Sequence, residues 1–267
     1  MKYYLIAGEA SGDLHGSNLM KGILKADPGA RFRFWGGDKM AAVGGAENLA
    51  MHYEKASFMG FTEVLKNLRT IFGQIEQCKR DVAAYAPDVL VLIDYAGFNL
   101  RLARFGRERG IPTYYYIAPK VWAWKESRVK KIRRWVDRLF VIFPFEVEYF
   151  RRRGIEAIYE GNPLMDAIDA RRAALGSKEE FRAVHGLDGR PVVACLAGSR
   201  RSEIGYNLPF MVELSGRFPQ YQFVVAGVPW LDRSVYEPLI AGSPVRYVCD
   251  ATYELLAHSE AAVVTSG

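Results

Sequence analysis

The residue best placed to act as an acid or a base is Asp94, which directly follows an unbroken apolar run. The run at residues 89–93 reads VLVLI, and a short, uncharged, β-branched run is typical of a strand buried on both faces of a parallel sheet. Open α/β sheets bind their ligands just beyond the carboxyl ends of such strands. Asp is also a favoured N-cap for a following helix. Position alone therefore leaves two roles open for Asp94, catalysis and capping.

Two loops rich in small residues have the composition of anion-binding turns. GEASGD at residues 8–13 and AGSRRSE at residues 197–203 each follow an expected strand. Backbone N–H groups in such turns, and the helix N-termini behind them, favour negative charge. The adjacent guanidinium groups of Arg200 and Arg201 suit a diphosphate. Neither loop has the spacing of a nicotinamide or ATP motif, and a tight turn with Asp13 as a helix cap explains the first loop equally well.

Two further segments combine apolar and basic side chains. In PKVWAWK at residues 119–125, the tryptophans can stack on a sugar or base while the lysines neutralise a phosphate, or the rings can pack beneath a loop. Residues 61–85 have apolar side chains at helical spacing, which predicts a helix with one apolar face. Core packing is the first interpretation of that face, and contact with a membrane interface is the second. The membrane-facing candidates are Phe58, Met59, Phe61 and Phe72.

Positive charge is concentrated in one part of the chain. The 267 residues have a formal net charge of +6, but residues 101–153 alone hold 15 Lys and Arg against 5 Asp and Glu. This region predicts an anionic partner, which can be a phosphate substrate, an acidic membrane surface or nucleic acid. The three cysteines form no CxxC pair, which supports neither a disulfide framework nor a zinc site and fits a reducing cytoplasm. The hydrophobic content of 50% excludes disorder, and no apolar run is long enough to span a bilayer.

The elements that would position these residues alternate between strand and helix. In residues 1–165 we expect strands at 2–7, 31–35, 89–93, 113–117, 139–143 and 157–159, and helices at 14–26, 61–85, 98–110, 126–135 and from 145. This repeat predicts a doubly wound parallel sheet. Residues 166–187 are interpreted as a helical connection. Residues 188–267 form a second α/β domain, with strands at 192–196, 222–225, 245–248 and 261–264 and helices at 207–218 and 253–259.

Seven short segments, taken in order, carry a resemblance to a known family. They are GEASGD at 8–13, IDYAGFN at 93–99, VWAW at 121–124, FPFE at 143–146, GNP at 161–163, GSR at 198–200 and TSG at 265–267. This set resembles the motifs of the lipid-A-disaccharide synthases, which are inverting glycosyltransferases with two Rossmann-like domains in the GT-B architecture. The resemblance covers the whole chain. It implies an acceptor and catalytic domain at 1–165 and part of a nucleotide-sugar-binding domain at 188–267.

The resemblance implies a specific reaction. The family transfers 2,3-diacylglucosamine from a UDP-linked donor to 2,3-diacylglucosamine 1-phosphate, which gives the β-1′,6-linked lipid A disaccharide 1-phosphate and UDP. Asp94 matches the base that deprotonates the acceptor hydroxyl, and Arg200 matches an arginine expected at the donor phosphates. The family commonly has a second Asp where this chain has Gly97, so that carboxylate is not essential here. The sequence has no DxD metal motif, so arginines and a helix N-terminus would stabilise the diphosphate without a metal or other cofactor.

The resemblance also implies the remaining site residues and the partners. The donor side comprises Ser199, Arg200, Arg201, Glu203, Ser266 and Gly267. The acceptor side comprises Gly8, Glu9, Ser11, Gly12, Asn99 and Trp122. The acylated substrates imply a peripheral protein on an anionic membrane, at the cytoplasmic face of the bacterial inner membrane, without a nucleic-acid partner. A homodimer is one option for the full-length form.

Two other classes of protein remain as alternatives. A nucleotide-sugar epimerase can share the two-domain shape and would release UDP without transfer to an acceptor. A non-catalytic peripheral membrane protein can share the basic region and the apolar helix, and would bind anionic vesicles equally well with or without UDP. We also expect the second domain to be truncated and the chain to be a fragment with little or no transferase activity. The reason is that Gly267 falls within an expected strand-to-helix turn.

Overall fold

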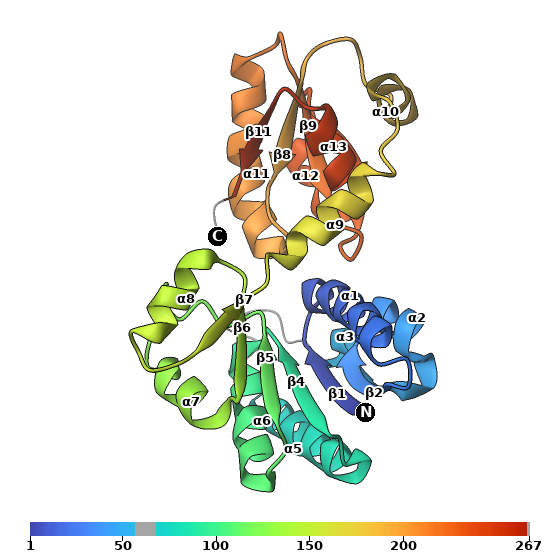
Figure 1. Cartoon of the computed structure of the whole chain (residues 1–267). Coiled ribbons are helices and arrows are strands. Elements are labelled where there is room, and N and C mark those ends of the chain that lie inside the picture. Colours follow the sequence, from blue (N-terminus) through green and yellow to red (C-terminus); the bar gives the residue numbers. More distant parts are fainter. Residues whose placement is uncertain (57–67, 266–267) are drawn as a thin grey trace. The chain divides into compact units, whose positions relative to one another are not determined.

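The computed structural model describes residues 1–56 and 68–265 and divides into two compact α/β units, Met1–Met165 and Asp166–Gly267 (Figure 1). Each unit contains its own parallel sheet with helices on both faces. The predicted fold class is therefore confirmed, because strands and helices alternate and every strand pair recorded in the described residues is parallel.

The first unit has a seven-stranded sheet in its described residues. Across the sheet the strands are β3 (Leu49–His52), β2 (Arg31–Gly36), β1 (Lys2–Ala7), β4 (Val89–Ile93), β5 (Thr113–Tyr116), β6 (Arg138–Val141) and β7 (Ala157–Tyr159). The helices are α1 (Ala10–Ala26), α2 (Asp38–Gly44), α3 (Tyr53–Ala56), α5 (Leu68–Tyr85), α6 (Ala96–Arg109), α7 (Arg128–Trp135) and α8 (Pro144–Arg151), with a 3-10 turn η1 (Ala46–Asn48).

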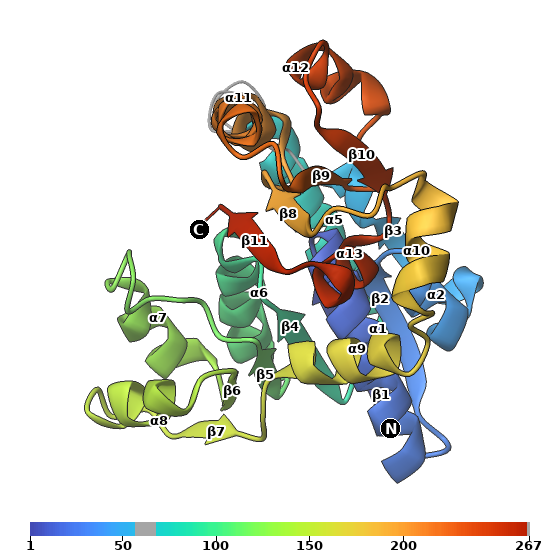
Figure 2. The ribbon, with the colours of Figure 1, turned by 90° about the horizontal axis from the view of Figure 1, so that it is seen from above.

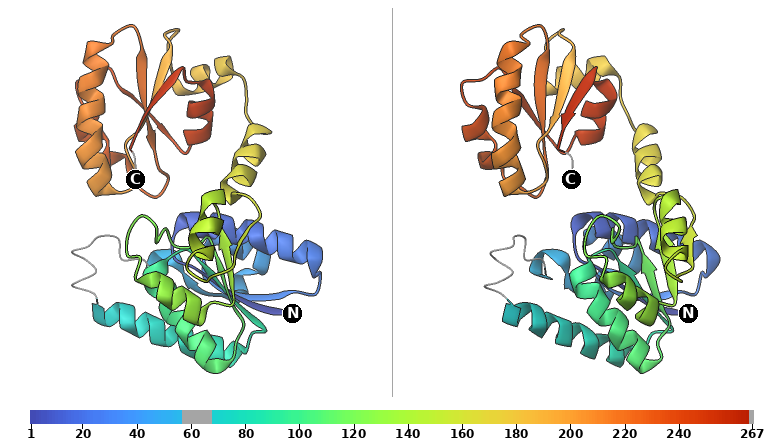
Figure 3. Two further views of the ribbon diagram at one scale, coloured as in Figure 1. Left: turned by 60° about the vertical axis from the view of Figure 1, so that its left-hand side comes forward. Right: turned by 90° about the vertical axis from the view of Figure 1, so that its left-hand side faces the viewer.

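The central strand β4 is buried along its whole length because it faces a core on each side. Leu90 and Leu92 pack into the core that contains residues of α5, α6 and α7, whereas Val89, Val91 and Ile93 pack into the core that contains residues of α1 and α2. Figure 3 shows α5, α6 and α7, in teal to green, on one side of this sheet and α1, in dark blue, on the other. A strand buried on both faces tolerates no polar side chain, so polar chemistry begins only where the strand ends.

The carboxyl ends of β1 and β4 form the topological switch point of the first sheet. The chain runs outward from β1 through β2 to β3, and in the opposite direction from β4 through β5 to β7. Ala7 pairs with Ile93 at the last position of the two strands, so Gly8 and Asp94 follow at the same edge. Open α/β sheets bind ligands at this point, because the helices that follow the two strands lie on opposite faces of the sheet.

The second unit has a smaller sheet built by the same rules. Its strands, in order across the sheet, are β10 (Arg246–Cys249), β9 (Gln222–Gly227), β8 (Val192–Leu196) and β11 (Ala261–Val264). Its helices are α9 (Pro163–Arg172), which crosses the division, α10 (Lys178–His185), α11 (Arg201–Arg217), α12 (Glu237–Ile240) and α13 (Thr252–His258), with a 3-10 turn η2 (Arg233–Val235).

The second sheet also has a core on each face. Cys195 and Val225 pack with residues of α11, whereas Ala194 and Val224 pack with residues of α10 and α13. Figure 2 shows α11 and α13 on opposite sides of β8 and β9. Strand β11 forms an edge of this sheet, and its Val264 side chain is exposed.

Most predicted boundaries are within about two residues of those observed, and three predicted elements differ by more. The helix expected at 14–26 begins at Ala10, so most of the GEASGD segment belongs to its first turn. The helix expected at 207–218 begins at Arg201, immediately after the Arg200 N-cap. The connection expected at 166–187 consists of two separate helices, α9 and α10. In the first two cases glycine and polar residues suggested a loop, but their backbones are helical.

Apart from the two 3-10 turns, four short elements of the described structure were not predicted: β3, α2, α3 and α12. Strand β3 has no fully buried residue, and its parallel pairing with β2 is interrupted by an irregularity between Phe34 and Trp35. Short elements of this kind depend on neighbouring elements for stability, so they give little local periodicity.

Candidate active site at the carboxyl edge of the first sheet

Asp94 lies at the switch point with its main chain fixed in an unusual conformation. Its φ is 43° and that of Tyr95 is 46°, so two consecutive non-glycine residues adopt left-handed backbone. Such conformations cost about 1–3 kcal/mol each and persist only where surrounding contacts enforce them. The Asp94 N–H donates to the Tyr116 carbonyl at 3.1 Å, and the Asp94 carbonyl accepts from the Tyr115 hydroxyl at 2.5 Å. The backbone of Asp94 is therefore held at both its N–H and its carbonyl.

The Asp94 carboxyl is half-buried, and burial raises its pKa above the usual 3.8. The N–H of Tyr95 and the positive charge of Lys120 offset part of that rise. The N-cap position of α6 is Tyr95 rather than Asp94. A carboxylate with a raised pKa at a ligand-binding strand end has the chemistry of a general base.

Asn99 holds the ends of two strands together at this edge. Its side chain is fully buried, and Nδ2 donates to the carbonyls of Ile93 at 3.1 Å, Asp94 at 2.9 Å and Ile6 at 3.4 Å. One side-chain amide on α6 thus connects the carboxyl ends of β1 and β4. The sequence analysis placed Asn99 among the acceptor-side residues; the structure shows its amide bound to the strand ends, and contact with an acceptor stays a prediction.

The loop after β1 packs closely against the Asp94 turn. A Cβ on Gly8 would collide with the Tyr95 ring, so only glycine allows this approach. Burial raises the pKa of the Tyr95 hydroxyl, and the nearby charge of Glu9 raises it further. Gly12 is buried against Ala7, whereas Ser11 is exposed on the first turn of α1. Gly8 and Glu9 are therefore brought next to the Asp94 turn.

Asp13 has a structural role that differs from the predicted one. Its buried carboxylate accepts from the N–H groups of Gly37 at 2.7 Å, Lys39 at 3.0 Å and Met40 at 3.0 Å. It therefore caps α2, although it lies in the first turn of α1. Long-range capping of this kind satisfies N–H groups that a helix end leaves unpaired.

Trp122 lies on an exposed aromatic surface beside the same sheet edge. Its indole N–H donates at 2.9 Å to Glu146, a fully buried carboxylate that also accepts from the N–H groups of Ile142 and Phe143. The Trp122 ring meets Phe143 and Phe145 edge to face, and it is 40% exposed. The exposed ring surface is available for stacking on an apolar sugar face.

Glu146, Tyr115 and Tyr95 are site residues that the sequence analysis did not assign. Glu146 had a usable signal, because it is the last residue of the FPFE segment, at the start of a helix where an acidic side chain can accept from free N–H groups. Tyr115 and Tyr95 carry no such local signal, since each acts through contacts with residues on other elements.

In the second unit the predicted donor residues form the turn between β8 and α11. Gly198 has a φ of 118°, and the exposed Ser199, Arg200 and Arg201 follow it. The Glu203 carboxylate accepts from the N–H groups of Ser199 at 2.9 Å and Arg200 at 3.2 Å, and from the Arg200 guanidinium at 3.0 Å. Glu203 thus holds the donors of this turn together and does not itself offer a donor to phosphate.

Trp230 is an exposed side chain at this turn that the sequence analysis overlooked. Its indole N–H donates to the Ser199 carbonyl at 3.1 Å. The tryptophan follows β9, so it connects the ends of two neighbouring strands. Ser266 and Gly267, the last two predicted donor residues, lie outside the described residues.

The membrane-facing candidates are only partly described. Phe58, Met59 and Phe61 lie outside the described residues. Phe72 is 52% exposed, which corrects the core interpretation for this residue, whereas Ile75 on the same helix is buried. The Arg101 guanidinium lies 5.6 Å from the centre of the Phe72 ring. No helix in the described part of the chain is long and apolar enough to cross a membrane, and these residues contain no cluster of three or more His, Cys, Asp or Glu that could hold a metal.

Comparison of the sequence with known proteins identifies the family. The family model described as lipid-A-disaccharide synthetase matches residues 3–267. The lipid-A-disaccharide synthase of Geobacter sulfurreducens is 39% identical over 98% of this chain and 69% of its own length. The corresponding protein of Syntrophus aciditrophicus is 37% identical with the same coverage.

Solved structures show the same fold at low identity. The UDP-GlcNAc 2-epimerase of Neisseria meningitidis has a TM-score of 0.71 at 13% identity, over 100% of this chain and 78% of that structure. A sucrose-phosphate synthase from Thermosynechococcus elongatus has a TM-score of 0.55 at 14% identity, over 99% of this chain and 75% of that structure. These likenesses establish the architecture, whereas the sequence matches establish the family: the chain belongs to the lipid-A-disaccharide synthetase family.

Proposed function

We propose that this chain contains the acceptor site and catalytic base of an inverting glycosyltransferase of lipid A synthesis. The reaction joins the 2,3-diacylglucosamine of a UDP donor to 2,3-diacylglucosamine 1-phosphate and releases UDP. One observation carries the proposal: Asp94 lies at the switch point of the first sheet, and its backbone N–H and carbonyl are both hydrogen-bonded. The chain that holds it belongs to a family of synthases.

Asp94 acts as the general base of the transfer. Its carboxylate takes the proton of the acceptor 6-hydroxyl while that oxygen forms a bond to the anomeric carbon of the donor. The bond from that carbon to the diphosphate oxygen breaks at the same time, so UDP leaves and the configuration inverts. Burial makes the carboxylate more basic, which favours proton transfer near neutral pH.

The turn after β8 binds the donor diphosphate in this proposal. Arg200 provides positive charge, and the N–H groups of Ser199 and Arg200 lie at the start of the 17-residue helix α11. In the described structure these donors are bound to Glu203. The diphosphate of the UDP-sugar must therefore displace the Glu203 carboxylate from these N–H groups, or bind to them at the same time as Glu203 does.

The protein acts at an anionic membrane surface, because both substrates are acylated. Phe72 presents an exposed ring beside Arg101, and each Lys or Arg near an acidic surface contributes about 1 kcal/mol. Phe72→Ser should weaken sedimentation with anionic vesicles, whereas Phe210→Ser, an exposed phenylalanine on α11, is the matched control. If Phe72→Ser leaves vesicle binding unchanged and lowers the unfolding temperature, Phe72 stabilises the fold and does not contact the membrane.

Epimerase chemistry is less well supported. The likeness to UDP-GlcNAc 2-epimerases rests on 13% identity and concerns the fold, whereas the synthase relatives reach 39%.

The deciding experiment supplies both lipid substrates to a form that spans the relatives' full length and measures disaccharide and UDP together. Equal amounts of the two products are expected. UDP release without disaccharide would favour the epimerase class. UDP titration of the 267-residue chain is measured in parallel.

A further inference from the structure

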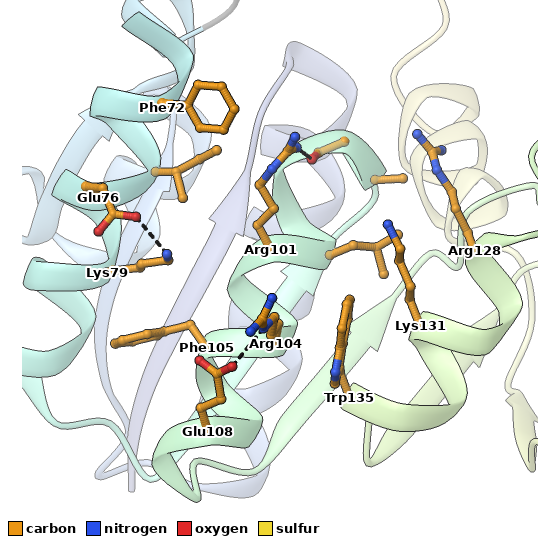
Figure 4. Close-up of a pocket in the computed structure, with 14 residues that line it drawn as sticks. Phe72, Glu76, Lys79, Arg101, Arg104, Phe105, Glu108, Arg128, Lys131 and Trp135 are labelled. Atoms are coloured by element: carbon orange, nitrogen blue, oxygen red, sulfur yellow. Dashed lines mark hydrogen bonds and ion pairs between the residues drawn. The ribbon is translucent and has the colours of Figure 1, made fainter. Parts of the chain in front are cut away.

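A groove on the first unit is lined by apolar and basic side chains to which the proposed reaction assigns no role. It lies along α6, between α5 and α7, and has a volume of about 660 Å³ (Figure 4). This volume is within the usual range for sites that bind small molecules. The groove starts at Ala96 and Gly97, directly after the Asp94–Tyr95 turn, and extends along α6 to Glu108.

The groove has an apolar floor. Ile75 and Leu100 are buried in the core beneath it, and the rings of Phe72, Phe105 and Trp135 form its sides. An apolar lining of this extent favours a hydrocarbon chain, because each buried methylene contributes about 0.8 kcal/mol.

Five cations and two carboxylates line the groove, but the charges are unevenly paired. Lys79 binds Glu76 at 2.7 Å, and Arg104 binds Glu108 at 2.7 Å. The other three cations, Arg101, Arg128 and Lys131, have no carboxylate partner among residues 1–56 and 68–265.

The three unpaired cations gather at one end of the groove. Figure 4 shows the charged groups of Arg101, on α6, and of Arg128 and Lys131, on α7, on the two sides of the groove at the end away from Glu108. The Arg101 guanidinium donates to the Gly97 carbonyl, which places it at the first turn of α6. The positive end of the α6 dipole lies at the same turn. This end therefore suits a phosphate group, and it is the end nearest in sequence to Asp94.

We infer that this groove holds the acceptor lipid, with its 1-phosphate at Arg101, Arg128 and Lys131 and an acyl chain along the apolar floor. The inference rests on the proposed function, since it assigns the acceptor to the side of Asp94 that α6 and α7 form. A phosphate bound here directs the acceptor sugar towards the sheet edge, where its hydroxyl meets the Asp94 carboxylate.

The test measures binding of monomeric, short-chain 2,3-diacylglucosamine 1-phosphate to the 267-residue chain by calorimetry. Arg101→Gln, Arg128→Gln and Lys131→Gln should each weaken affinity about 10-fold, since each removes a charge-assisted contact. Lys130→Gln is the matched control, because Lys130 is exposed on α7 next to Lys131 but does not line the groove. The same lipid without its phosphate should bind the wild-type chain weakly and should be insensitive to all four substitutions.

Three outcomes separate this inference from its alternatives. Unchanged affinity for the phosphorylated lipid in the three variants overturns it. If the variants lose binding to phosphatidylglycerol vesicles while affinity for the monomeric acceptor stays the same, the groove contacts membrane phospholipid and the inference is again overturned. If wild-type protein binds the acceptor through these cations but the full-length form makes no disaccharide, the proposed function fails and the groove assignment stands.

Discussion

The carboxyl ends of β4 and β8 have similar architecture, but the acidic residue at each end makes different contacts. Each is a buried strand that turns into a long helix, α6 or α11. At β4, Asp94 is held by its main chain, and burial raises the pKa of its carboxyl. At β8, Glu203 lies in the first turn of α11 and accepts hydrogen bonds from two N–H groups and a guanidinium. The end of β4 thus presents a carboxylate with a raised pKa, and the end of β8 presents a cluster of N–H and guanidinium hydrogen-bond donors.

The two turns also differ in how they accommodate left-handed backbone. At β8 the positive φ falls on Gly198, which adopts it without a steric penalty. At β4 it falls on Asp94 and Tyr95, so the conformation has to be enforced by neighbouring groups. Asn99 and Tyr115 supply that enforcement through the Asp94 carbonyl. The comparison indicates that the turn after β4 holds Asp94 in a strained backbone conformation, whereas the turn after β8 is unstrained. The following substitutions test this difference.

The largest effect is expected for Asp94→Asn. The amide keeps the size of the side chain but cannot accept a proton, so turnover should fall about 100-fold or more while the fold persists. Turnover is measured on a form that spans the relatives' full length. Asp88→Asn, at the other end of β4, is the control and should leave turnover nearly unchanged. Near-normal activity of Asp94→Asn would remove the distinction between the two strand ends.

The next effect separates the strained turn from the relaxed one. Asn99 donates to three strand-end carbonyls, whereas Asn207 on α11 donates only to the Ala197 carbonyl among its recorded contacts in the described residues. Asn99→Ala should lower the free energy of unfolding by about 2–3 kcal/mol, and Asn207→Ala by about 1 kcal/mol. Denaturant unfolding measures both. Equal costs would mean that the Asp94 turn needs no special support.

A smaller effect is expected at the donor turn. Arg200→Gln removes one guanidinium from the proposed diphosphate site and should weaken UDP binding about 10-fold. Arg217→Gln, on the same helix and paired with Glu213, is the control. Calorimetric titration with UDP at low and high salt measures the difference. Equal UDP affinity in the two variants would show that Arg200 serves only its contact with Glu203.

The smallest effect concerns the pH dependence of stability. The folded-state pKa of Asp94 is raised, so the folded protein binds this proton more tightly than the unfolded chain does. The resulting stability is complete below the unfolded pKa near 3.8 and is lost as the pH rises through the folded pKa. Asp94→Asn should therefore be as stable as wild type, or slightly more stable, at neutral pH, and thermal unfolding across the pH range measures this. A variant that is clearly less stable at neutral pH would mean that hydrogen bonds to the ionised carboxylate outweigh its burial.

The sequence by itself determined the strands that are buried on both faces and the place of Asp94. The runs that form β4 and β8 are apolar throughout, and those of β1 and β9 are apolar over most of their length, because both faces of these strands contact a core. This pattern can be read from the sequence without knowing which elements are neighbours. The order of strands and helices then predicted doubly wound parallel sheets, and the motif set indicated the family that the comparisons show.

Tertiary structure decided which groups these residues serve. Asp13 on α1 caps α2, Glu146 on α8 accepts the indole N–H of Trp122, and Arg101, Arg128 and Lys131 line one groove. None of these partners is set by a local period, since each depends on which strands are neighbours in the sheet. A residue's type fixes which hydrogen bonds and charges it can offer, and the packing of distant segments fixes where they are used.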